Sequence, residues 1–98
     1  MNTIEKMYEV LRAEKPNLSK REFSEQYLEM SSGYMTAMKY YKRDASLKAL
    51  ANLRDTLGSE LNAWRAVHAT HNTERTRRNV EKAEQLHALA TETLLDAV

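Results

Sequence analysis

Apolar residues recur at helical spacing near the start of the chain. One broad stripe consists of Ile4, Met7, Tyr8, Val10 and Leu11. This pattern favours an amphipathic helix that buries one face, and Thr3 is placed to cap its start. The residue before a proline is disfavoured in the helical conformation, so Pro16 predicts that this helix ends near Glu14.

Two shorter helices joined by a turn are expected between residues 19 and 43. Ser19 and Glu22 have the spacing of a capping box at the start of the first. The apolar residues that follow fall on one helical face, and they are Phe23, Tyr27 and Leu28.

The second of these helices is expected to follow a turn at Gly33, with a cap from Ser31 or Ser32. Its inner side repeats an apolar residue every three positions, and that side consists of Met35, Met38 and Tyr41. Its outer side is polar and basic, with Ser32, Thr36, Lys39, Tyr40, Lys42 and Arg43.

A longer apolar stripe begins after Ser46, which is placed to cap a helix from Leu47. The stripe consists of Leu50, Leu53, Leu57, Leu61 and Trp64. Gly58 lies within it and has two interpretations. A glycine often ends a helix, whereas a helix that continues through it loses about 1 kcal/mol of stability. We expect a break or a sharp kink at Gly58.

A last helix is predicted from Glu74 almost to Val98, with Thr73 as its cap. Residues with an alternating three-four spacing form a possible coiled-coil seam, and they are Val80, Ala83, His87, Ala90, Leu94 and Ala97. A domain this short is not expected to bury both the seam and the other apolar residues of so long a helix. The seam therefore predicts a homodimer, in which a second copy covers it. The alternative is that the helix folds back over the leucine stripe within one chain.

Composition narrows the fold class to all-α. The 98 residues include only two glycines, one proline and no cysteine, which is too few turn residues for a strand-rich fold. The absence of cysteine excludes disulfides and fits a reducing cytoplasm. No apolar run approaches the about 20 residues that a membrane span needs, and the first ten residues lack a signal-peptide pattern. We therefore expect a cytoplasmic protein.

Charge is unevenly distributed along the chain. The net charge is only +1, yet residues 30–43 hold three basic residues and no acidic one. A short helix with one apolar face and an opposite polar, basic face is typical of proteins that bind in the major groove of DNA. A helix face that is simply solvated is the other interpretation.

Residues 19–43 resemble the helix-turn-helix of bacterial and phage repressors. The pattern falls on Phe23, Ser24 and Tyr27, on Met30 as the apolar residue before the turn serine Ser31, and on Met35 and Met38 after the turn. Two departures are an extra turn residue, with Glu29 the best candidate, and Leu28 where the family usually has glycine. The segment is also similar to short proteobacterial proteins predicted to be helix-turn-helix, over about residues 4–58.

The resemblance implies an N-terminal trihelical core followed by a long C-terminal helix. Residues 1–58 would be the DNA-binding domain and residues 59–98 a C-terminal extension for dimerisation. The implied base contacts are Ser32, Gly33, Thr36, Ala37 and Tyr40. The implied phosphate contacts are Lys20, Arg21, Lys39, Lys42 and Arg43.

Catalytic chemistry finds little support in the sequence. His68, His71 and Glu74 have a spacing that zinc accepts, but they straddle a predicted helix boundary and no further ligand accompanies them. No serine lies in a glycine-flanked elbow, and there is no glycine-rich phosphate loop. We therefore expect no enzyme activity, no cofactor and no metal.

Three classes of function remain. A homodimeric transcriptional regulator that binds double-stranded DNA explains the motif, the basic face and the last helix. A helical module that binds a protein partner, such as an antitoxin-like or phage inhibitor protein, explains the low net charge equally well. A structural assembly protein leaves the basic face unexplained.

Overall fold

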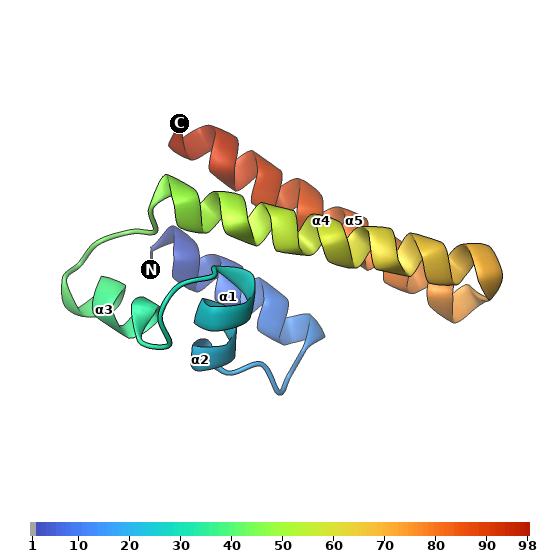
Figure 1. The fold of residues 1–98 in the computed structure, drawn as a ribbon, viewed down its shortest axis with the longest axis horizontal. Helices are drawn as coiled ribbons and strands as arrows, with labels where there is room; N and C mark the ends of the chain where they lie inside the picture. Colours follow the sequence, from blue (N-terminus) through green and yellow to red (C-terminus); the bar gives the residue numbers. More distant parts are fainter. Residues whose placement is uncertain (1) are drawn as a thin grey trace.

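The chain folds into helices only, so the all-α prediction is confirmed. The computed structural model describes residues 2–98, and no strand occurs within this range. In chain order the elements are α1 (Thr3–Glu14), α2 (Lys20–Glu22), the π-helix η1 (Phe23–Tyr27), α3 (Tyr34–Tyr40), α4 (Leu47–Thr70) and α5 (Glu74–Ala97). Figure 1 shows α4 and α5 as a long hairpin, with the shorter elements gathered along part of it.

The core lies on the leucine stripe of α4. Leu50, Leu53, Leu57 and Leu61 are all buried, and the core around them includes residues from α1, η1 and α5. The buried face of α1 consists of Ile4, Met7, Tyr8 and Leu11. The predicted inner face of the next segment is also confirmed, because Phe23, Tyr27 and Leu28 are buried. Trp64, at the far end of the stripe, stays 37% exposed.

The break expected at Gly58 is wrong, because α4 continues without interruption from Leu47 to Thr70. At this glycine α4 approaches a side chain of α5 closely. A Cβ atom built at Gly58 would lie 3.3 Å from the imidazole ring of His87 on α5, which is tight for such a contact. The expected domain boundary at residue 58 therefore falls inside a continuous helix.

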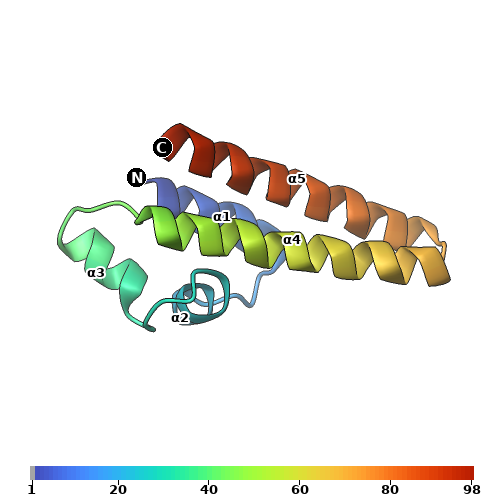
Figure 2. The same ribbon diagram turned by 45° about the horizontal axis from the view of Figure 1, so that its top comes forward.

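Most of the predicted seam of α5 packs against the rest of its own chain, whereas Ala97 at its end is exposed. Ala83 and Ala90 are buried, His87 lies against Gly58, and Leu94 packs on the core. Figure 2 shows α5 running back along α4 over the whole length of the hairpin. The premise that α5 cannot bury its stripe within one chain is therefore wrong. The homodimer itself stays a prediction.

Side-chain caps mark most of the helix starts. Ser19, Ser46 and Thr73 each accept a backbone N–H from three residues ahead, as predicted. Two caps differ from expectation. Asn2, and not Thr3, caps α1, and α3 begins after Gly33 without a side-chain cap from Ser31 or Ser32.

Truncation of Phe23 tests the predicted buried face. Phe23 is fully buried. The centroid of its ring lies 5.5 Å from that of the Tyr8 ring and 5.9 Å from that of the Tyr27 ring. Phe23→Ala should lower the free energy of unfolding by about 3–5 kcal/mol, because it removes a large apolar side chain and leaves a cavity. Denaturant titration measures this change.

Tyr40→Ala is the matched control, because its ring is 78% exposed. It should change stability by no more than about 0.5 kcal/mol. Equal effects of the two substitutions would show that the buried face is assigned wrongly.

Candidate nucleic-acid interface

The segment before the turn is a π-helix instead of an α-helix. In η1 the Leu28 N–H donates to the Phe23 carbonyl oxygen at 3.1 Å, a spacing one residue longer than in an α-helix. Leu28 is consequently turned fully into the core. Glu29, with a φ of 52°, takes the left-handed conformation.

Two polar side chains of α4 hold the end of η1. The Asn52 amide donates to the Leu28 carbonyl oxygen at 2.9 Å, and the Thr56 hydroxyl donates to that of Tyr27 at 3.4 Å. Carbonyl groups at a helix end lack hydrogen-bond donors within their own helix. Here α4 supplies the missing donors. Sequence reasoning missed both residues, because each lies next to a leucine of the stripe and reads as solvent-facing.

Helix α3 is attached to the core at few points. Met35 is its buried residue, whereas Met38 is only partly buried and Tyr41 is 65% exposed. The expectation of Tyr41 on the inner side is therefore wrong. Tyr34 provides a further attachment, because its hydroxyl oxygen accepts the Ser46 N–H at 3.0 Å and so joins α3 to the start of α4.

A Schellman motif ends α3. The Arg43 N–H donates to the Met38 carbonyl oxygen at 2.8 Å, and the Lys42 N–H donates to that of Lys39 at 3.2 Å. Lys42 has a φ of 53°, the left-handed conformation that this motif requires and that glycine usually supplies. These hydrogen bonds fix the backbone conformation at Lys39, Lys42 and Arg43.

The loop after α3 is tied to the start of α1. Asp44 accepts the Thr3 N–H at 3.2 Å and the Ile4 N–H at 3.3 Å, and Asn2 donates to the Arg43 carbonyl oxygen at 3.2 Å. Partial burial alone would raise the pKa of Asp44. The hydrogen bonds from Thr3, Ala45 and Ile4 outweigh it and hold this pKa below its ordinary value.

The implied DNA contacts lie together on the outside of α2, α3 and the loops beside α3. Ser32, Gly33, Thr36 and Tyr40 are exposed and Ala37 is partly exposed. All five implied phosphate contacts are exposed, namely Lys20, Arg21, Lys39, Lys42 and Arg43. Figure 1 and Figure 2 both show α3 at the end of the molecule away from the α4–α5 turn.

Carboxylates lie near the basic side chains at the end of α3 without pairing with them, because Glu5 and Asp44 line the same hollow as Lys39, Lys42 and Arg43. Within residues 2–98, no carboxylate lies at ion-pair distance from Lys39, Lys42 or Arg43, whereas Arg21 pairs with Glu25 at 3.2 Å. Tyr40 and Tyr41 add an exposed aromatic pair, with ring centroids 5.0 Å apart and planes at 86°. The face therefore combines basic, hydroxyl and aromatic groups.

The zinc-like spacing forms no metal site. No group of three histidine, cysteine or acidic side chains is suitably placed within the described part of the chain. The His68 ring instead lies 2.7 Å from the Thr76 hydroxyl. Glu74 is hydrogen-bonded to Arg77 at 2.6 Å, which lowers the pKa of the carboxyl.

The fold defines a small all-helical protein built on a long hairpin, and the described helices include none long and apolar enough to span a bilayer. The chain belongs to DUF6626, a family of unknown function, whose model matches residues 4–97. Comparison with curated proteins and with solved structures gave no match.

Asp44→Ala tests the tie between the α3 loop and α1. At about pH 7 it should lower the free energy of unfolding by about 0.5–2 kcal/mol, the range for a lost helix cap. The lowered pKa of Asp44 means that its contribution is present above the ordinary carboxyl pKa and is lost as the pH falls through the folded value. The difference from wild type should therefore shrink as the pH falls below the ordinary carboxyl range.

Denaturant titrations at several pH values measure this dependence. The matched control is Glu9→Ala, which removes an exposed carboxylate from the middle of α1 and should have little effect at any pH. A cost of Asp44→Ala that is the same at every pH would contradict the tie.

Proposed function

We propose that this protein is a sequence-specific regulator that binds double-stranded DNA through the outer face of α3. The observation that carries the proposal is the exposed basic face of α3, which follows the π-helix η1 in the chain. The π-helical turn of η1 and the left-handed Glu29 after it are compatible with the one extra residue by which this sequence departs from the repressor-type pattern, and this supports the proposal. Under this proposal α2, η1 and α3 form the motif, and the protein works in the cytoplasm.

The geometry of α3 supports contact with the major groove. The groove admits one α-helix, and the first turns of a recognition helix meet base edges. Here those turns carry the exposed Thr36 and the open Gly33, where nothing lies within 4 Å of an added Cβ atom. The backbone of DNA can therefore approach closely at the start of α3.

Electrostatics supports phosphate contacts at the other end of α3. Lys39, Lys42 and Arg43 lack carboxylate partners within the described residues, so binding would release counterions from DNA without first breaking ion pairs. The side chain of Arg43 is also available, because the tie to Asn2 uses its carbonyl oxygen.

A protein partner is the second candidate, and the exposed Tyr40–Tyr41 pair favours it. Tyrosine and arginine are enriched among residues that dominate protein interfaces, and both occur on this face. The two candidates differ in salt dependence and in base discrimination, so substitutions on one face distinguish them.

Lys42→Gln and Thr36→Ala should impair DNA binding in different ways. Loss of the Lys42 charge should weaken binding to every duplex and lower the salt slope by about one. Loss of Thr36 should cost about 1–3 kcal/mol on the preferred duplex only. Anisotropy titrations with preferred and scrambled duplexes at several salt concentrations measure both effects.

Arg75→Gln is the matched control, because it removes an exposed charge near the α4–α5 turn, far from α3. It should leave affinity and slope unchanged. If the triple variant Lys39→Ala, Lys42→Ala, Arg43→Ala bound DNA like the wild type at low salt, this face would not be the DNA interface.

A homodimer remains part of the proposal, since two copies can read two half-sites one helical turn apart. The last turn of α5 leaves Leu95 66% and Val98 87% exposed. Leu94 is unsuitable as a test position, because it packs on the core of its own chain.

If the exposed apolar end of α5 forms the dimer contact, Leu95→Glu should convert the dimer into monomers in sedimentation experiments, because it places a charge in that contact. Gln85→Glu, at an exposed position in the middle of α5, is the control and should leave the dimer intact. A wild-type protein that is already monomeric at about micromolar concentration would refute the dimer.

A further inference from the structure

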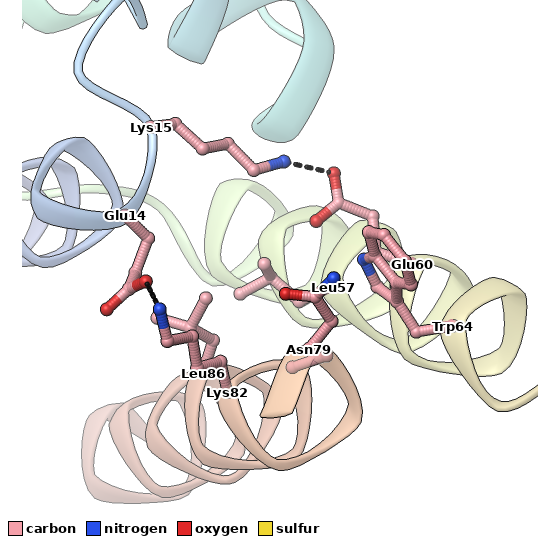
Figure 3. Close-up of a pocket in the computed structure, with 9 residues that line it drawn as sticks. Glu14, Lys15, Leu57, Glu60, Trp64, Asn79, Lys82 and Leu86 are labelled. Carbon is pink, nitrogen blue, oxygen red and sulfur yellow. Dashed lines mark hydrogen bonds and ion pairs between the residues drawn. The ribbon is translucent and has the colours of Figure 1, made fainter. Parts of the chain in front are cut away.

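A second candidate site lies away from α3, where the end of α1 meets α4 and α5. The three elements and Lys15, which follows α1, line an open cavity of about 180 Å³. Figure 3 shows the side chains that line it. Its floor is apolar, with Leu57, Ala83 and Leu86, and the indole of Trp64 forms one wall. Concave sites with an apolar lining and a few polar groups are typical of small-molecule binding.

Two ion pairs flank this apolar floor. Lys15 lies 2.9 Å from Glu60, and Lys82 lies 3.0 Å from Glu14. Their side chains are between 32% and 55% exposed, and pairs of this kind contribute only about 0–1 kcal/mol. A ligand can therefore take over one partner of each pair at little cost.

Glu60 has a second hydrogen-bond partner besides Lys15. The Tyr27 hydroxyl donates to Glu60 at 2.6 Å. Burial and this hydrogen bond raise the pKa of Tyr27, so the hydroxyl stays protonated and keeps donating. Glu60 thus retains a partner when a ligand replaces Lys15 beside it.

The balance of charge identifies the class of ligand. Two ammonium groups and two carboxylates line the cavity and neutralise one another in pairs. A ligand with a single charge would leave a net charge in the cavity, whereas a zwitterion keeps it neutral. We propose that the cavity binds a small zwitterion with a large apolar body, the chemistry of a free α-amino acid with an aromatic or branched aliphatic side chain. Its carboxylate would pair with Lys82, its ammonium group with Glu60, and its side chain would lie against Trp64. This site does not depend on the proposed DNA binding.

Trp64 provides a direct probe, because it is the only tryptophan in the chain. Titration of the full-length protein with L-phenylalanine or L-leucine should change its emission saturably, with a dissociation constant of about 1 mM or lower. Phenethylamine and 3-phenylpropanoate each lack one of the two charges, and each should bind at least about tenfold more weakly than L-phenylalanine.

Lys82→Gln and Glu60→Gln should each weaken L-phenylalanine binding by about tenfold or more. Lys48→Gln is the control, because it removes an exposed lysine in the first turn of α4, outside the cavity. Circular dichroism checks that each variant is folded, and calorimetry detects binding that leaves Trp64 emission unchanged.

Two results would overturn the proposal. One is the absence of saturable binding of both amino acids by fluorescence and by calorimetry up to about 10 mM. The other is equal affinity for L-phenylalanine and for either analogue with a single charge.

Discussion

The packing of α1, η1 and α5 against the leucine stripe of α4 is the interaction on which the rest of the structure depends. Leu53 and Leu57 are almost completely buried in the middle of it. The same helix carries Asn52 and Thr56, whose side chains hold the carbonyl groups at the end of η1. Core formation and the position of the turn before α3 are therefore coupled through one helix.

Helix α3 is presented to solvent with little apolar burial of its own. Met35 is its buried residue, and hydrogen bonds at Tyr34, Arg43 and Asp44 attach the segment to the starts of α4 and α1. Directional bonds of this kind orient a helix while leaving most of its surface free. A basic face can consequently be displayed in a defined direction by a chain whose net charge is only +1.

Periodicity and caps predicted most of the fold, because these signals are local. The buried faces and the caps Ser19, Ser46 and Thr73 needed no knowledge of distant residues. The close approach of Gly58 to His87 joins residues that are remote in sequence, and local signals do not reveal it. The tie between Asp44 and α1 likewise joins residues 40 and 41 positions apart. For the candidate site, local pattern predicted the exposed basic face, whereas the π-turn in η1 and the exposure of Tyr41 depend on tertiary packing.

The central claim is that α3 reads the sequence of duplex DNA. Selection of random-sequence duplexes by the immobilised full-length protein, followed by sequencing, tests it most directly. The account predicts enrichment of one short motif, repeated at about one helical turn if the protein is a dimer. Recovered duplexes without any shared motif, at a salt concentration where the protein remains folded, would contradict it.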